Sequence, residues 1–386
     1  MRDGFAVVDA DAHVIEPDDL WERYFEPSLR ERAPRHLNRA FAIAVDGTPI
    51  NTPADWEPGG DDRQQARRDE RIQATFAELF PEAYARGFDA VAQLADMDRE
   101  GIDLAFLYPS YGLFATASSD IDPLIADATC RAYNSWLADF CSAAPDRLHG
   151  VGMVALHDPA RAAREAARVH DELGFRGVFA RPNPIRGRNL DDRAYDPLWE
   201  ALSEHGMSIG LHEGGMPPLP QAGADRLTNA EQKHICSHPM EQMVAAVSLI
   251  YGGVLERFPG LRVVFLEAGC GWLPFWLERM DDHYEKGLAR DFGASNDLTM
   301  APSEYFARQC FVSADADEHM LGHVIEALGD ARIVFSTDYP HPDSKYPRAV
   351  EGFLALDGVS DTSKRQILWD NALDLYRIDP SAAVTG

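Results

Sequence analysis

Residues 5–14, FAVVDADAHV, form a short run of apolar and β-branched residues in which polar side chains recur at every second position. Seven further apolar runs follow, at 103–108, 148–155, 175–180, 207–212, 261–267, 309–313 and 332–336. Helical patterns separate them; Ala162, Ala166, Val169 and Leu173 are one example. Near-continuous apolar strands that alternate with helices indicate a buried parallel sheet, and eight strands are the number that closes a barrel. The sequence therefore predicts an α/β fold of the (β/α)8 TIM-barrel type.

Three segments interrupt this alternation, and we interpret them as insertions in a single domain that spans residues 1–386. They cover 18–85 after the first strand, 213–234 after the fifth strand, and 281–303 before the seventh strand. The stretch FAIAVDGTPI, residues 41–50, predicts a small hairpin with its turn at Asp46-Gly47. Long ordered loops of this kind tend to form the walls of a site. An open doubly wound sheet is the alternative fold, but no G-x-G-x-x-G motif follows the first strand to support it.

The charge balance limits the classes of partner that we expect. The chain has 36 basic and 63 acidic residues, a formal net charge of −27, and no cluster of Lys or Arg. Neither nucleic acid nor an anionic membrane surface is therefore an expected partner, because both attract basic surfaces. The five cysteines are scattered without a C-x-x-C pair, which favours a reducing cytoplasm. We also find no apolar signal core and no run of 18 apolar residues, so we expect neither secretion nor a membrane span.

Polar side chains at the ends of three predicted strands indicate a metal site. Asp9, Asp11 and His13 share one face of the first strand, where burial is costly unless the groups are paired or bind a ligand. His212 ends the fifth strand and Asp338 follows the eighth, at the rim where barrel active sites lie. Asp11, His13, His212 and Asp338 together suit one divalent cation; we expect Zn²⁺ first, with Mn²⁺ or Fe²⁺ as alternatives. The competing interpretation is a salt-bridged rim that holds no metal.

Further candidates surround this set, each with a structural alternative. His238 begins a predicted helix and either faces the site as a general acid or has no role. Arg181 and Asn183 are candidates for binding a substrate carboxylate, whereas a salt bridge at the rim is the alternative for Arg181. His341 lies between two prolines that fix its direction. Glu16 either orients a metal ligand or simply precedes Pro17.

Four motifs resemble the aminocarboxymuconate-semialdehyde decarboxylase-like branch of the amidohydrolase superfamily. They are DADAHVIEP (9–17), GLHEGG (210–215), FLEAGCGWLPFWLERM (265–280) and STDYPHPD (336–343). The resemblance implies an (α/β)8 barrel with one divalent metal, often zinc, and makes a homodimer an expectation. Its members include non-oxidative decarboxylases of aromatic or enoic acids, and hydrolases. It implies that Asp11, His13, His212 and Asp338 are ligands and that Asp338 also shuttles a proton. Arg181 lacks a neighbouring lysine of the kind that bridges two metals in other superfamily members, which favours one metal.

One departure from this family decides between two activities. The decarboxylases carry a histidine near the end of strand six, with an acidic residue three positions later in some members. This sequence has Glu267 and Cys270 at those positions. We therefore expect a mononuclear metal-dependent hydrolase first, acting on a small acidic or aromatic substrate. The alternative is a non-oxidative decarboxylase, and a second alternative is a metal-binding barrel without catalytic activity.

The two activities give the candidate residues different tasks. In the hydrolase, metal-activated water would attack a carbonyl and Asp338 would take the proton of the water. His238 or His341 would stabilise the oxyanion, Arg181 would anchor the substrate, and Glu267 would be part of the catalytic set. In the decarboxylase, the metal would bind the carboxylate and the adjacent hydroxyl of the substrate, and Asp338 would protonate the ring carbon.

Overall fold

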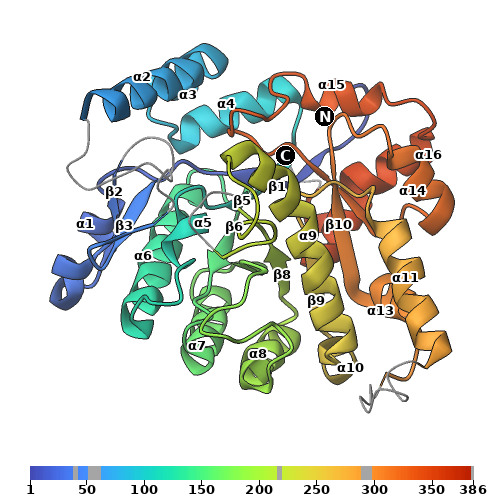
Figure 1. The fold of residues 1–386 in the computed structure, drawn as a ribbon. Helices are drawn as coiled ribbons and strands as arrows, with labels where there is room; N and C mark the ends of the chain where they lie inside the picture. The colour runs from blue at the N-terminus through green and yellow to red at the C-terminus, as the bar shows by residue number, and fades with distance from the viewer. Residues whose placement is uncertain (38–41, 51–61, 215–219, 288–297, 384–386) are drawn as a thin grey trace.

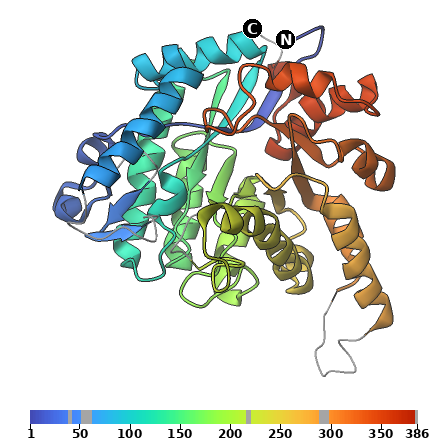
Figure 2. The same ribbon diagram turned by 45° about the horizontal axis from the view of Figure 1, so that its top comes forward.

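The computed structural model describes residues 1–37, 42–50, 62–214, 220–287 and 298–383, and its centre is one sheet of eight parallel strands. In their order around the sheet these are β1 (Val8–His13), β5 (Leu104–Tyr108), β6 (Leu148–Met153), β7 (Gly177–Ala180), β8 (Ser208–Leu211), β9 (Arg262–Phe265), β10 (Cys310–Asp315) and β11 (Ile333–Ser336). Each predicted strand is present, and helices surround the sheet (Figures 1 and 2). The predicted (β/α)8 barrel is confirmed.

Helices and short helical turns follow the strands along the chain, and the longer ones bury apolar side chains in the core that the strands form. The helices and turns are α4 (Ala90–Glu100), α5 (Gly112–Ala115), α6 (Pro123–Cys141), α7 (Pro159–Asp171), η2 (Arg193–Tyr195), α8 (Asp196–His205), α9 (Ala230–Tyr251), α10 (Val254–Arg257), α11 (Leu273–Lys286), α13 (Pro302–Gln309), α14 (Leu321–Leu328), α15 (Ala349–Leu354), α16 (Asp361–Arg365), η3 (Gln366–Asp370), α17 (Asn371–Tyr376) and α18 (Pro380–Ala383). Helix α7 shows why such segments become helical. The Asp158 side chain accepts hydrogen bonds from the first turn, Pro159 occupies the first position, and Ala162, Ala166 and Val169 are buried.

The first and last strands of the barrel are joined by hydrogen bonds that involve the residues just after β11. The Asp338 N–H donates to the Asp11 carbonyl at 3.1 Å, and the His13 N–H donates to the Tyr339 carbonyl at 2.6 Å. The Asp9 carboxylate accepts from the N–H and the hydroxyl of Thr337. We call this contact between β1 and β11 the seam. It brings the polar ends of the two strands together.

The pairing of β1 with β5 shifts by one residue between Asp9 and Ala12, as a β-bulge does. The extra residue breaks the strict alternation that the sequence pattern assumes. The Asp9 carboxylate accepts from the Asp11 N–H as well as from Thr337, so Asp9 holds the seam and is absent from the clustered ligand atoms. The expectation that Asp9 points the same way as Asp11 and His13 is therefore corrected by the bulge.

The insertion after β1 forms its own small elements. These are α1 (Leu20–Tyr24), η1 (Pro27–Arg32), an antiparallel sheet of β2 (Arg35–His36), β3 (Ile43–Val45) and β4 (Thr48–Ile50), α2 (Asp62–Leu79) and α3 (Pro81–Ala85). The hairpin between β3 and β4 turns at Asp46 and Gly47, whose φ angles are 53° and 75°, as predicted. Two successive residues with positive φ form the turn that matches the twist of a hairpin.

Parts of each predicted insertion, at 38–41, 51–61, 215–219 and 288–297, lie outside the described residues. The segment predicted as an insertion at 281–303 begins later than expected, because α11 continues to Lys286. None of the five cysteines is in a disulfide. Within the described ranges, no helix combines the length and the apolar character that crossing a bilayer requires.

Candidate metal centre

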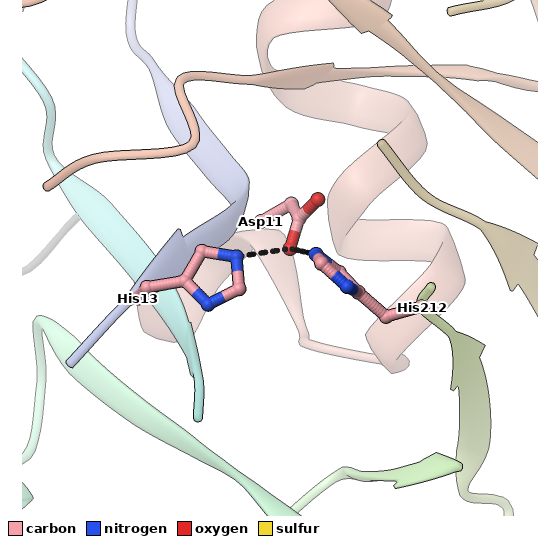
Figure 3. A group of neighbouring side chains, drawn as sticks. All are labelled: Asp11, His13 and His212. Atoms are coloured by element: carbon pink, nitrogen blue, oxygen red, sulfur yellow. Dashed lines mark ion pairs between the residues drawn. The ribbon is translucent and has the colours of Figure 1, made fainter. Parts of the chain in front are cut away.

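The four predicted ligands converge at the carboxyl ends of the strands. Asp11 and His13 lie in β1, His212 follows β8 and Asp338 follows β11. The Asp11 Oδ1 atom is 3.6 Å from the Nε2 atom of His13 and 3.6 Å from that of His212 (Figure 3). The Asp338 Oδ1 atom is 3.2 Å from His13 Nε2. The side chains of Asp11, His13 and His212 are fully buried, and that of Asp338 is 16% exposed.

Backbone carbonyls orient both histidines. His13 Nδ1 is 2.8 Å from the Pro109 carbonyl, and His212 Nδ1 is 2.7 Å from the Glu213 carbonyl. Because a carbonyl only accepts, Nδ1 must carry the proton in each ring, and the Nε2 lone pair then faces Asp11. Metal-binding histidines are commonly fixed in this way by a partner for the second nitrogen.

The atoms that face one another lack internal partners. Within the described residues, both Asp11 oxygens and the Nε2 atoms of His13 and His212 are buried without a hydrogen-bond partner. Such groups are costly unless something satisfies them. Two ligands of a tetrahedral ion with bonds of 2.0–2.1 Å are separated by about 3.3 Å, close to the spacings found here. The donor atoms therefore fit one divalent cation.

Asp338 forms a close ion pair with His341. Asp338 has a φ angle of 57°, and its Oδ1 atom is 2.7 Å from His341 Nδ1. Burial alone would raise the pKa of Asp338, but the charge of His341 lowers it well below its ordinary value. Burial opposes the charge on His341, yet Asp338 raises the pKa of His341 to about 9. Ser110 Oγ is 3.0 Å from His341 Nε2 and holds the other side of the ring.

The role of Glu16 is visible only in three dimensions. Its carboxylate accepts hydrogen bonds from the N–H groups of Ser110, Tyr111 and Gly112 at 3.2, 3.0 and 2.8 Å. Burial nevertheless raises its pKa to about 7. Glu16 thus fixes the loop after β5, and this loop places Ser110 beside His341. The sequence analysis missed Ser110, although its position just after a barrel strand was the available signal.

Glu267 and His238 form a second pair near the ligands. The Glu267 Oε2 atom is 3.2 Å from His238 Nε2 and 3.4 Å from His212 Nε2. Glu267 has a φ angle of 49° just after β9, and its side chain is 18% exposed. Burial raises the pKa of Glu267 well above its ordinary value and lowers that of His238. The structure therefore brings both predicted residues to the metal centre, while their catalytic roles stay predictions.

Arg181 and Asn183 are buried behind this centre. Arg181 donates to the Asn183 side chain at 3.1 Å, to Glu213 Oε1 at 2.5 Å and to the Leu113 carbonyl at 3.1 Å. These contacts correspond to the salt-bridge alternative for Arg181, and they fix Glu213, whose carbonyl orients His212. Substrate binding by Arg181 and Asn183 stays a prediction.

A cavity of about 420 Å³ opens onto the centre. Its lining includes the buried His238, the partly buried Asp338 and Glu267, and the exposed Asp343 and Lys345. The cavity is large enough for a small organic molecule that reaches both the ligand Asp338 and the Glu267–His238 pair.

The chain is similar to several known proteins. A 2-amino-3-carboxymuconate-6-semialdehyde decarboxylase from Dictyostelium discoideum is 26% identical over 313 residues, which cover 78% of this chain and 80% of that protein. The crystal structure of 5-carboxyvanillate decarboxylase from Sphingomonas paucimobilis is 28% identical, with a TM-score of 0.65 over 74% of this chain and 82% of that one. A 5-carboxyvanillate decarboxylase from Novosphingobium aromaticivorans, solved with manganese and 4-hydroxy-3-methoxy-5-nitrobenzoic acid, shares the fold at 21% identity and a TM-score of 0.66, over 98% of this chain and 97% of that one.

The model of the amidohydrolase family matches residues 8–378, nearly the whole chain. The match begins at β1 and ends just beyond α17, so it includes the seam and every candidate ligand. The chain therefore belongs to the amidohydrolase family, in the branch that resembles aminocarboxymuconate-semialdehyde decarboxylase.

Proposed function

We propose that this protein is a metal-dependent, non-oxidative decarboxylase of an aromatic or enoic acid. The proposal rests on the convergence of three buried donor groups and the partly buried Asp338, which is paired with His341, in a chain similar over most of its length to decarboxylases. The comparisons favour this alternative over the hydrolase that the loss of the strand-six histidine suggested.

Asp11, His13, His212 and Asp338 would hold the cation. When bound, a divalent ion supplies positive charge that binds the carboxylate and a neighbouring oxygen of the substrate. Two nitrogen and two oxygen donors suit Zn²⁺, Mn²⁺ and Fe²⁺, so Zn²⁺ stays our first expectation and metal analysis decides between them.

Protonation of carbon is the task of Asp338 and His341. In decarboxylation the bond between the carboxyl carbon and the ring or chain carbon breaks, and its electron pair remains on the substrate carbon. That carbon takes up one proton as CO₂ leaves. Asp338 lines the cavity and delivers this proton, and His341 Nδ1, 2.7 Å away, supplies the proton to Asp338. Ser110 keeps the His341 ring in place.

Glu267 and His238 line the same cavity as Asp338. His238 Nδ1 is 3.2 Å from the His234 carbonyl and 3.2 Å from the Ser237 hydroxyl. In the tautomer that donates to the carbonyl, Nδ1 carries the proton of the neutral ring and Nε2 is an acceptor. Nε2 and the Glu267 carboxylate are then two acceptors 3.2 Å apart, so a proton shared between them is the simplest arrangement. We propose that this pair uses that proton to donate a hydrogen bond to a polar group of the substrate. Glu267 stands at the position where the decarboxylases of the resembling branch carry a histidine.

The test uses the metal-loaded protein and a panel that contains 5-carboxyvanillate, 2,6-dihydroxybenzoate and 2-amino-3-carboxymuconate-6-semialdehyde, together with ester, lactone, amide and β-diketone substrates. We expect CO₂ release from a carboxylate substrate and, in D₂O, one deuterium on the carbon that lost the carboxyl group. Hydrolysis would instead place ¹⁸O from labelled water in the product. The appearance of that oxygen label without CO₂ release would overturn the proposal in favour of the hydrolase.

A further inference from the structure

A second set of metal-ligand side chains lies beside the four ligands. His234 and His238 are four residues apart in α9, so both imidazoles lie on one face of the helix. Glu267 faces them from the end of β9. One ligand atom from each of the three residues lies within 4.8 Å of the others. Two histidines at this helical spacing with one carboxylate form a set of donors that suits zinc and neighbouring transition metals.

His238 is oriented as the histidines of the metal centre are. Its Nδ1 atom lies 3.2 Å from a backbone carbonyl, that of His234, and also 3.2 Å from the Ser237 hydroxyl, and its Nε2 atom points to Glu267. The separation of 3.2 Å between Nε2 and the carboxylate oxygen is close to the edge of about 3.3 Å between two ligands of a tetrahedral zinc ion. Two facing acceptors require something positive between them, and either a proton or a metal cation meets that need.

His234 makes this position accessible from solvent. It is exposed, and its ring centroid is 4.1 Å from that of His238 with the planes tilted by 32°. All three residues line the 420 Å³ cavity, whose walls carry six carboxylates and one lysine. A cleft lined by one sign of charge concentrates counter-ions, so cations are drawn to this set from the cavity side.

We propose that His234, His238 and Glu267 form a second, weaker site for a zinc-like divalent cation, and that its occupation inhibits the enzyme. The site offers three donors, one of them exposed, whereas the centre at the seam offers four. A cation there occupies the Glu267 and His238 atoms that face the substrate. Two imidazole donors select Zn²⁺, Cu²⁺ or Ni²⁺ over Mg²⁺. The inhibitory part rests on the proposed function, whereas the binding part does not.

Zinc stoichiometry tests the binding part without any substrate. Equilibrium dialysis of the metal-stripped protein at pH 7.5 should give two Zn²⁺ ions per chain, one bound with high affinity (the tight ion) and one with low affinity (the weak ion). His234→Ala should retain the tight ion and weaken the second at least tenfold, whereas His13→Ala should lose the tight ion and retain the weak one. His205→Ala is the matched control, because His170, Asp171 and His205 form the other histidine-containing cluster away from the cavity in the described part of the chain. Binding of a single Zn²⁺, or loss of the weak ion in His205→Ala with retention in His234→Ala, would overturn the site.

Turnover with increasing Zn²⁺ tests the inhibitory part. The wild-type protein should gain activity as the first ion binds and lose it as the second binds, and Mg²⁺ should cause no such loss. His234→Ala should keep the basal activity and require at least tenfold more Zn²⁺ for inhibition. Equal inhibition of wild type and His234→Ala would overturn the regulatory role. If no carboxylate substrate is turned over at all, the proposed function fails, while the stoichiometry still decides the second site.

Discussion

Two buried carboxylates in this barrel have opposite surroundings. Glu165, in α7, is 1% exposed and accepts hydrogen bonds from Asn134, Arg131 and Arg168 at 2.7 to 3.0 Å. Asp11, in β1, is equally buried, yet no described residue donates a hydrogen bond to either of its oxygens. Burial raises the pKa of Asp11 well above its ordinary value, and the charges of Asp338 and Glu267 add to this effect. A buried charge alone therefore does not mark a site, whereas a buried charge without a counter-charge does.

The largest expected effect concerns the seam. Asp338→Asn should lower turnover by about 10²–10⁴-fold, the usual contribution of a positioned general acid, while it keeps much of the metal, because an amide oxygen coordinates but does not shuttle a proton. His13→Ala should instead remove the metal. Metal analysis and CO₂ release on both variants check this, and equal loss of metal in the two would remove the proton-shuttle role from Asp338.

Replacement of Glu165, the carboxylate with hydrogen-bond partners, should lower the stability of the fold and leave the metal in place. Glu165→Gln removes the carboxylate that is 2.7 Å from Arg168, whose side chain is 12% exposed, and leaves only Glu172 at 3.8 Å as a charged partner. We expect the free energy of unfolding to fall by about 2 kcal/mol, less than for a fully buried pair because Arg131 is half exposed to solvent. Urea unfolding and metal content measure the two halves of this prediction. Loss of metal without loss of stability would reverse the distinction between the two regions.

A half-buried group, His149 in β6, adds a pH test away from the metal centre. Burial, together with the charge of Arg176, lowers the pKa of His149 to about 4. Between pH 6.5 and 4 the unfolded chain takes up a proton that the folded protein does not, so stability falls as the pH falls. Relative to His149→Gln, the wild-type protein should lose about 1–2 kcal/mol more between pH 7.5 and 5. Parallel pH curves for the two proteins in urea unfolding would show that His149 titrates normally when folded.

The smallest expected effect completes the comparison with Glu165. In the presence of a chelator at pH 8, Asp11→Asn removes a buried carboxyl group that has no counter-charge. Its free energy of unfolding should stay equal to that of the wild type or rise by about 1 kcal/mol, because an unpaired buried charge is unfavourable. Chemical denaturation of both metal-free proteins measures this. A loss as large as that of Glu165→Gln would mean that the fold itself needs the Asp11 charge.

The sequence predicts the features that depend on local pattern. The eight strands are recognisable because strands buried on both faces are continuous apolar runs, and Asp11, His13, His212 and Asp338 are recognisable because they end such runs. Contacts between distant segments are not visible in this way. Glu16 binds a loop 94 residues away, and Ser110 contacts His341 across 231 residues. The bulge that redirects Asp9 also leaves no local pattern, because one extra residue in a strand still reads as regular alternation.

The seam also has a consequence for how the protein is made. Asp11 and His13 lie in the first strand of the barrel, whereas Asp338 follows its last strand. A ribosome-bound or prematurely terminated chain that ends before residue 338 contains at most three of the four donors. The complete set of candidate donors therefore exists only once the last strand of the barrel has been made, and shorter chains lack the Asp338 carboxylate.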